Sequence, residues 1–350
     1  MNNAQSAIDS CPYANFDDST SVNDLLELAR RPQIQVLQCS VPVRDAVWSW
    51  VNEHFCPLRP EVQLRVYRHG TSECNLSFTR LLPNVRHFAA NCLMRATGVE
   101  YLAELQGLKS LSLDIFDLTD FSVLEKLPPQ LSSLTLGATR SKRPTLAPLS
   151  RFQHLRVLCL EGQSKDINVL SELAELETLT LRSITTPDIH YLGQLPKLWS
   201  LDIKLGGIRD FTGIEGKDSI KYLELWQVRD LRSIDIVAAL PSLQNLFLQS
   251  LPHVQWFPSL TESIALRRIW IENFKGLRDF TALETAPALE EFALINGRKQ
   301  TPQQLLPVLL NPQVRRIRAG FGSDRKNSEF SSLREVHGKT GFDWAPFEYQ

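Results

Sequence analysis

The chain has 350 residues, and its 38 lysine and arginine residues nearly balance its 39 aspartate and glutamate residues. Hydrophobic residues make up 43% and charged residues 22%, which is the composition of a water-soluble globular protein. The net charge of −1 gives no overall attraction to nucleic acid or to acidic membranes. No run of about 18 apolar residues is present, so we expect no membrane-spanning helix.

The N-terminus and the cysteines both favour a cytoplasmic protein. The first residues have neither a basic start nor an apolar core, so they predict no secretory signal. The six cysteines form no C-x-x-C pair, and they are too sparse for a disulfide-stabilised scaffold. We therefore expect reduced thiols and no metal site.

Two segments precede the regular part of the chain. Residues 1–20 are polar and aperiodic, which predicts a disordered lead-in. Residues 21–84 read as a mixed α/β cap that covers the first hydrophobic layer of the regular part. The elements expected in this cap are a helix after Ser21, a strand over 33–38, a helix over 45–55 and a strand over 61–67, the last with the apolar spacing of a degenerate repeat.

From residue 85 onward one pattern recurs. Between Lys197 and Glu272 it is written four times, as KLWSLDIK, SIKYLELW, SLQNLFLQ and ALRRIWIE, each with apolar residues at its second, fifth and seventh positions. The first apolar residue recurs every 21 to 25 residues along the chain. These first residues are Val85, Leu108, Leu131, Leu155, Leu176, Leu198, Ile220, Leu243, Leu266, Leu289 and Val314.

This L-x-x-L-x-L spacing resembles that of the leucine-rich repeat proteins of the short, internalin-like class. The resemblance implies an α/β solenoid, or horseshoe, with parallel strands on the concave face and short helical or 3₁₀ turns on the convex face. It assigns residues 85–320 to the repeat array and residues 321–350 to a C-terminal cap. The side chains expected to cover the last repeat are Phe330, Leu333, Phe342, Trp344 and Phe347.

The convex part of each repeat has its own pattern, an apolar pair spaced by three residues. An aspartate often precedes this pair, where it is expected to accept hydrogen bonds from the first free N–H groups of a short helix. These aspartates are Asp120, Asp166, Asp188, Asp210 and Asp279. The family's asparagine ladder is missing, because no asparagine stands eight residues after a first apolar residue. The curvature of the array therefore stays open.

Catalytic motifs are absent from the sequence. It contains no glycine-rich phosphate loop, no H-E-x-x-H and no G-x-S-x-G, and its seven histidines are scattered without metal-ligand spacing. We expect a protein that is not an enzyme and that needs no cofactor.

The strongest functional signal lies on the concave face. Outward positions are small and mostly serine or threonine in the first half of the array, but large, aromatic and charged in the second half. Aromatic residues and arginine dominate binding hot spots. The predicted partner-binding residues are Asp202, Lys204, Tyr222, Glu224, Trp226, Phe247, Arg268, Trp270 and Glu272. The alternative is that these aromatic side chains only stabilise the strands.

The sequence thus predicts a protein-protein interaction scaffold whose partner offers apolar and some basic groups. Inhibiting, regulating or neutralising that partner, as an immunity protein does, would suit a chain without another domain. One alternative is nucleic-acid or polyanion binding through Arg315, Arg316 and Arg318, with Arg325 and Lys326 nearby. Another is a surface or secreted adhesion protein like the internalins, which the N-terminal sequence disfavours.

Overall fold

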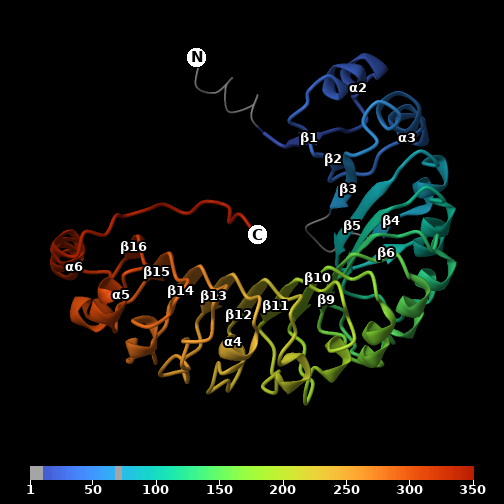
Figure 1. The fold of residues 1–350 in the computed structure, drawn as a ribbon. Helices are drawn as coiled ribbons and strands as arrows, with labels where there is room; N and C mark the ends of the chain where they lie inside the picture. Colours follow the sequence, from blue (N-terminus) through green and yellow to red (C-terminus); the bar gives the residue numbers. More distant parts are fainter. Residues whose placement is uncertain (1–10, 68–72) are drawn as a thin grey trace, which may run out of the picture. The chain divides into compact units, whose positions relative to one another are not determined.

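The structure is a computed structural model that describes residues 11–67 and 73–350 (Figure 1). It consists of two compact units, Met1–Glu175 and Leu176–Gln350, which we describe separately. In both units parallel strands form one side of each repeat and short helical turns form the other (Figure 1). This is the repeat architecture that the sequence predicts.

Unit 1 contains a parallel sheet with the strand order β1-β2-β3-β5-β7-β8-β9 and a small second sheet of β4 and β6. Its strands are β1 (Tyr13–Asn15), β2 (Val36–Cys39), β3 (Gln63–Tyr67), β4 (Cys74–Asn75), β5 (His87–Leu93), β6 (Ala96–Thr97), β7 (Ser110–Ile115), β8 (Ser133–Leu136) and β9 (Val157–Glu161). Its helical segments are α2 (Val22–Ala29), α3 (Asp45–Trp50), a π-helical turn (Val51–Phe55) and 3₁₀ turns at Ser77–Leu81, Val99–Glu104, Ser122–Lys126, Ala147–Arg151 and Ile167–Glu172.

The start of unit 1 differs from the sequence-based expectation in one respect. Strand β1 lies inside the stretch predicted to be disordered, and it pairs in parallel with β2. Because β2 and β3 continue the same sheet, the segment expected to be a separate cap extends the ladder of strands. The prediction for residues 1–10 falls outside the described residues.

The helices near this end form as their sequences predict. Ser21 caps α2 through its hydroxyl and Asp24 returns the bond, which is a capping box. The Trp48 ring of α3 is 2% exposed, stacks on Phe78 at 3.8 Å and meets the edge of Phe16 at 5.1 Å. These rings close the apolar layer at this end of the unit.

Unit 2 contains a parallel sheet with the strand order β10-β11-β12-β13-β14-β15-β16. Its strands are β10 (Thr178–Arg182), β11 (Ser200–Lys204), β12 (Tyr222–Trp226), β13 (Asn245–Gln249), β14 (Arg268–Glu272), β15 (Glu291–Ile295) and β16 (Arg316–Ala319). Its helices are α4 (Ile236–Ala239), α5 (Leu306–Leu310), α6 (Asp324–Val336) and 3₁₀ turns at His190–Leu192, Thr212–Ile214, Thr281–Leu283 and Pro302–Leu305.

The apolar positions of successive repeats fall in register and form the core of unit 2. Leu201 pairs with Leu223, Leu223 with Leu246, and Leu246 with Ile269, and each of these side chains is fully buried. The first apolar residues of the repeats are also buried, as Leu198 and Ile220 illustrate. The predicted period is therefore the period of the structure.

The aspartates that precede the helical turns behave as predicted in four of five positions. Asp120, Asp188, Asp210 and Asp279 each accept a hydrogen bond of 2.8 to 3.1 Å from the backbone N–H two residues on. The prediction is wrong for Asp166, which has a φ of 62° and accepts a hydrogen bond from the Thr145 hydroxyl instead.

Backbone hydrogen bonds connect neighbouring repeats of unit 2, which lack the asparagine ladder. The residue after each of strands β10 to β14 is left-handed, with φ between 50° and 58°, and its N–H donates to the carbonyl that ends the next strand at 2.7 to 3.0 Å. These residues are Ser183, Leu205, Gln227, Ser250 and Asn273. Buried amide side chains add bonds elsewhere; Gln300, for example, donates to the carbonyls of Phe274 and Leu277.

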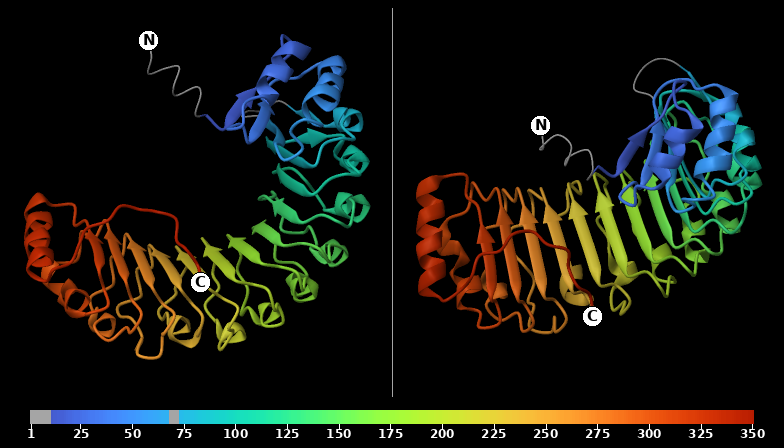
Figure 2. Two further views of the ribbon diagram at one scale, coloured as in Figure 1. Left: turned by 45° about the horizontal axis from the view of Figure 1, so that its top comes forward. Right: turned by 90° about the horizontal axis from the view of Figure 1, so that it is seen from above.

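The end of unit 2 also differs from the expectation. Helix α6 covers the last repeat, with Phe330 buried against Phe321 at 5.7 Å. Residues 341–350, which we call the C-terminal segment, do not join this cover. They run back across the strands of unit 2, on the side that faces away from the helical turns (Figure 2).

Ser250→Gly is expected to stabilise the protein by about 0.5–1 kcal/mol, because glycine tolerates the left-handed backbone that serine adopts at a cost. The test is the free energy of unfolding from urea titrations. Ser250→Ala is the control, since alanine keeps the Cβ atom and should bring no gain. Equal stability of the two variants would contradict the strain at this position.

Candidate functional site

The nine predicted partner-binding residues lie together on one face of unit 2. Strand alternation and the register of β11 to β14 arrange them in three rows across the sheet. The first row contains Tyr222 and Arg268; the second contains Asp202, Glu224, Phe247 and Trp270; the third contains Lys204, Trp226 and Glu272. We call the outward side chains of β11 to β15 the strand face.

One end of the strand face is a compact charged cluster. The Lys204 ammonium lies 3.2 Å from a carboxylate oxygen of Asp202 and 3.2 Å from one of Glu224. The Tyr222 hydroxyl donates to Glu224 at 2.9 Å, and the Thr180 hydroxyl donates to Asp202 at 3.3 Å. All three charged side chains are less than 20% exposed, so solvent screens these ion pairs only partly.

The environment of this cluster favours the protonated, neutral form of both carboxyl groups, because the pKa of each is raised. Burial raises the pKa of Asp202, and hydrogen bonding and charge from Lys204 only partly oppose it. Burial also raises the pKa of Glu224, and the neighbouring Asp202 raises it further. For Lys204, burial lowers the pKa, but the two carboxylates together more than compensate, so the net shift is upward. The ammonium is what keeps two buried carboxylates together.

Trp226 borders this cluster and is only partly used by the fold. The Arg182 guanidinium lies over its ring, 5.9 Å from the centroid. Its indole Nε1–H is buried and has no hydrogen-bond partner among the described residues, and the same holds for Oδ1 of Asp202. Both atoms are covered by neighbouring groups of the protein, so neither is offered at the surface of the strand face.

The other end of the strand face is buried. Arg268 pairs with Glu291 at 2.5 Å, and the Trp270 indole N–H donates to Glu272 at 2.9 Å. Arg268 is 6% exposed and Trp270 is 7% exposed. The expectation that these two side chains are exposed is therefore wrong.

The C-terminal segment is the reason for that burial. Phe342 meets the edge of the Trp270 ring at 6.1 Å, and Phe347 lies 5.0 Å from the Arg268 guanidinium. Tyr349 comes next along the segment, with its hydroxyl accepting a hydrogen bond of 3.2 Å from the Asn245 amide. A cavity of about 350 Å³ remains between this segment and the strands.

Sequence reasoning missed this placement, because the spacing of the aromatic residues does not tell which surface they cover. Aromatic side chains stand at Phe342, Trp344, Phe347 and Tyr349, and the spacing of three residues between the second and the third breaks the alternation of a single extended segment. We expected three of them to cover the last repeat. Helix α6 already seals that layer, so the aromatic rings pack on the nearest open apolar and cationic surface instead.

The basic patch near the end of the chain is largely engaged within the protein. Arg316 pairs with Glu291, and Arg318 pairs with Asp343 at 2.8 Å. The Lys326 ammonium donates to the carbonyls of Arg298 and Gln300. Of the five residues in the nucleic-acid alternative, Arg315 and Arg325 are exposed and form no ion pair with a described residue.

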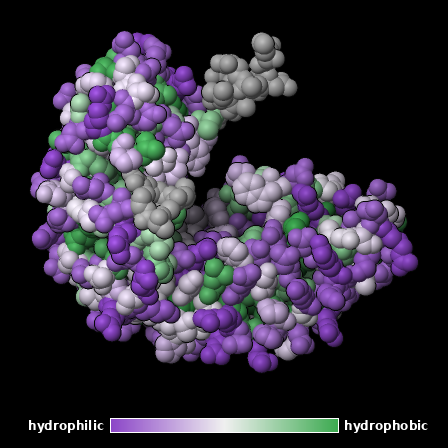
Figure 3. Space-filling view, turned by 180° about the vertical axis from the view of Figure 1, so that it is seen from behind, coloured by the Kyte–Doolittle hydropathy of each residue, from purple (hydrophilic) through white to green (hydrophobic). Residues whose placement is uncertain are grey.

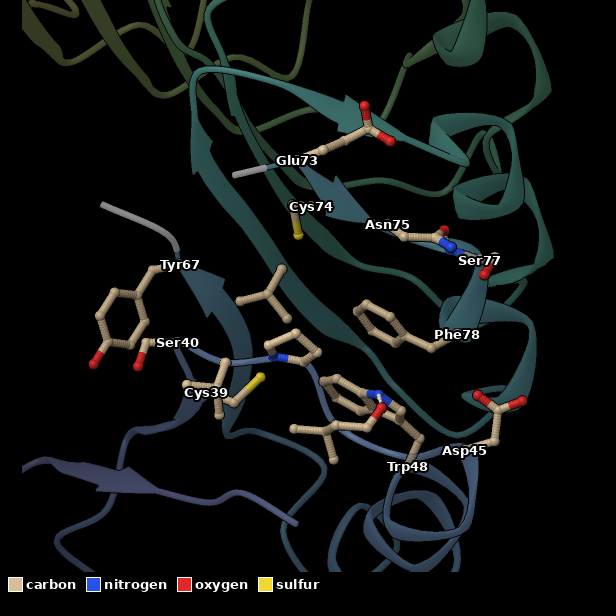
Figure 4. A pocket seen from close by; sticks show the side chains of 14 residues that line it. Cys39, Ser40, Asp45, Trp48, Tyr67, Glu73, Cys74, Asn75, Ser77 and Phe78 are labelled. Carbon is tan, nitrogen blue, oxygen red and sulfur yellow. Dashed lines mark hydrogen bonds between the residues drawn. The ribbon is translucent and has the colours of Figure 1, made fainter. Parts of the chain in front are cut away.

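A pocket of about 250 Å³ lies in unit 1 beside β2, β3, β4 and α3 (Figure 4). The rings of Trp48 and Phe78 and the side chains of Cys39 and Cys74 border it. No motif in the sequence pointed to it.

Neither a metal site nor a membrane span emerges from the described residues. Within 11–67 and 73–350, no group of three or more His, Cys, Asp or Glu side chains is placed to hold a metal ion. No helix in that part of the chain is both long enough and apolar enough to cross a bilayer.

No protein-family model and no curated protein matches the chain. Solved structures do resemble it. They include an internalin of Listeria monocytogenes (16% identity, 91% of this chain and 89% of that chain, TM-score 0.49) and a leucine-rich repeat protein of Leptospira interrogans (14%, 98% and 98%, 0.46). A third is the TLR13–ssRNA13 complex (15%, 91% and 52%, 0.54), so this chain spans about half the length of that one.

The in-register strands, the short 3₁₀ turns and the likeness to the third of these structures agree on the architecture. The chain has the leucine-rich repeat fold. At such low identities the likeness concerns the fold alone and carries no information about the site.

Lys204→Met is expected to destabilise this leucine-rich repeat protein by roughly 2 kcal/mol at pH 7.5, because it leaves two partly buried carboxylates without their cation. Both carboxyls have folded-state pKa values raised above their unfolded values. Keeping them ionised therefore destabilises the folded protein at high pH, and this destabilisation disappears as the carboxyls become protonated at lower pH. The deficit relative to wild type should therefore narrow between pH 7.5 and pH 5.

Urea unfolding at several pH values measures this deficit. Lys275→Met, at an exposed lysine, serves as the control and should change stability little at any pH. If the loss of unfolding free energy in Lys204→Met stays constant with pH, the two carboxylates are not its cause.

Proposed function

We propose that this leucine-rich repeat protein is a non-enzymatic scaffold that binds a partner protein on the strand face of unit 2. The observation that carries the proposal is the arrangement of nine aromatic and charged side chains in three rows on four adjacent strands. A folded polypeptide segment, the chain's own C-terminal segment, already lies on this face. The surface is therefore suited in shape and chemistry to polypeptide.

The charges of the face indicate what the partner offers. The acidic side chains of the face are Asp202 and Glu224, which both pair with Lys204, and Glu272, which accepts a hydrogen bond from the Trp270 indole. A partner with apolar side chains and some basic groups would complement this surface. The view from behind shows a mainly hydrophilic surface with dispersed apolar residues, in keeping with a binding site confined to another face (Figure 3).

The role that fits such a scaffold is one in which binding is the activity. We propose that it inhibits, regulates or neutralises its partner, as an immunity protein would, and that it acts in the cytoplasm. Residues 85–320 serve as the array in this proposal, with 21–84 and 321–350 as its two ends.

Binding of a polyanion is the weaker alternative. TLR13 is seen in complex with single-stranded RNA, but the likeness of this chain to it extends to the fold only. Here Arg316 and Arg318 are paired with acidic side chains, which reduces the charge available to phosphate. A polyanion site would show binding that falls steeply with salt and is lost in Arg315→Ala/Arg325→Ala.

Trp226→Ala/Phe247→Ala is expected to weaken partner binding at least about 30-fold, since each truncation removes an aromatic side chain of the kind that dominates binding hot spots. The partner is first isolated by affinity capture from native lysate and identified by mass spectrometry. Binding of the purified partner to wild type and variant is then measured by calorimetry.

The matched control is Glu262→Ala/Glu284→Ala, which alters two exposed residues outside the strand face and should bind as wild type does. Circular dichroism checks that each variant is folded. Equal affinity of the folded Trp226→Ala/Phe247→Ala variant and wild type would place the partner site elsewhere.

A further inference from the structure

We infer that the strand face of unit 2, together with the residues that directly precede strands β11 to β14, is a groove for an extended segment with two aromatic side chains two residues apart, and that the C-terminal segment occupies it until such a partner segment displaces it. The inference rests on the proposed function and names the chemistry of its partner. Three features of the groove carry it: its contacts to backbone, its two aromatic subsites and the light attachment of the present occupant.

The groove contacts the backbone of the segment, which any extended polypeptide could offer. The Gln244 side chain makes a reciprocal pair with Gln350, accepting from its N–H at 2.9 Å and donating to its main-chain oxygen at 2.8 Å. Lys221 donates to the same oxygen at 2.6 Å. Arg267 donates to the Glu348 carbonyl at 3.1 Å.

A fourth contact extends this line of donors along the segment. Arg268 donates to the Ala345 carbonyl at 2.9 Å, and it is itself held by Glu291. Cationic and amide donors of the repeats thus track the backbone of the segment over six residues, 345–350. These contacts favour an extended chain without specifying its sequence.

Two aromatic subsites add the specificity. The Phe347 ring lies 5.1 Å from the Arg267 guanidinium and 5.0 Å from that of Arg268, so it fills a cationic slot. The Tyr349 ring meets the edge of Trp199 at 5.1 Å, and its hydroxyl accepts a hydrogen bond from Asn245. Because side chains two apart share one side of an extended chain, a partner needs aromatic residues at that spacing.

The present occupant is only lightly attached. Residues 341–350 form no strand with the sheet, and most of them are exposed; Trp344 is 66% exposed and Tyr349 is 37% exposed. By contrast, Phe330 of α6 is 2% exposed and belongs to the core. Elements with few buried apolar contacts open at low cost. Release of the segment therefore leaves the repeats and α6 intact.

Release also creates a reason for another segment to bind. It uncovers Arg268 and Trp270, which are 6% and 7% exposed with the segment in place, and the exposed indole ring and guanidinium then favour a new aromatic occupant. The cavity of about 350 Å³ under the segment shows that the present occupant fills the groove incompletely. A partner segment with larger side chains there gains contacts that the C-terminal segment lacks.

The cost of self-occupation is set by how often the groove is closed. If the segment holds it about 90% of the time, the apparent affinity for a partner falls about ten-fold. Weakening the segment should raise that affinity by the same factor. The C-terminal segment is thus a competitor of the partner, and the effect is measurable in the full chain.

The experiment uses the full-length protein and a fluorescent peptide with the sequence of residues 339–350, with binding followed by anisotropy. Phe347→Ala/Tyr349→Ala in the protein is expected to raise the affinity for this peptide at least ten-fold over wild type, with one peptide bound per chain. Trp344→Ala is the matched control, because it truncates an exposed aromatic residue of the same segment. It should bind the peptide as wild type does.

A peptide that itself carries Phe347→Ala/Tyr349→Ala tests the two subsites and should not bind. The inference is overturned if the folded Phe347→Ala/Tyr349→Ala protein fails to bind the wild-type peptide, or if wild type binds it equally well. It is also overturned if wild type is a dimer that the double substitution dissociates, since a second copy would then supply the occupant.

The two proposals fail separately. If the peptide binds as expected but partner binding is unaffected by Trp226→Ala/Phe247→Ala, the groove is supported and the proposed partner site is wrong. If that variant loses partner binding but the Phe347→Ala/Tyr349→Ala protein binds no peptide, the proposed function is supported and this inference is wrong.

Discussion

In-register stacking of parallel strands is the constraint on which the structure of unit 2 depends. Because Leu201, Leu223 and Leu246 pair across neighbouring strands in one buried row, the residues between them have to form rows on the opposite face. The left-handed residue after each strand maintains this register, since its N–H bonds the last carbonyl of the next strand. The rows of outward side chains, which we propose as a binding surface, are thus a direct consequence of how the core is stacked.

Electrostatics decide which part of that surface stays open. Around Lys204 the charges satisfy one another and the rings are half-buried, so the surface keeps its shape without a cover. Around Arg268 the guanidinium has one acidic partner in Glu291 and retains donors that point outward. Backbone carbonyls and aromatic rings of the C-terminal segment meet those donors, which explains why an extended segment lies there.

Most of the fold could be predicted from the sequence, and the reason is periodicity. The apolar positions repeat every 21 to 25 residues, and a pattern sustained over many repeats fixes strand, turn and burial together. What failed was specific. Tyr13–Asn15 forms a strand only because β2 offers an edge to pair with, and Asp166 bonds Thr145 because its own backbone is left-handed. Both outcomes depend on contacts that local sequence does not contain.

The sequence could predict which residues lie on the candidate site, but not that the C-terminal segment covers part of it. Alternation placed all nine residues on one face, and the register then brought them together. Nothing in the spacing of Phe342, Phe347 and Tyr349 distinguishes packing on the last repeat from packing along the strands. That choice is made by the three-dimensional position of α6 and by the free donors of Arg267 and Arg268.

The measurement that tests this account most directly is oxidative footprinting of tryptophan by mass spectrometry. Trp270 is 7% exposed and Trp344 is 66% exposed, so one chain carries a protected site and its own exposed reference. The account predicts slow oxidation of Trp270 in wild type and fast oxidation in Phe342→Ala/Phe347→Ala/Tyr349→Ala, with Trp344 fast in both. Equal Trp270 rates in the two folded proteins would contradict the claim that the C-terminal segment occupies the strand face.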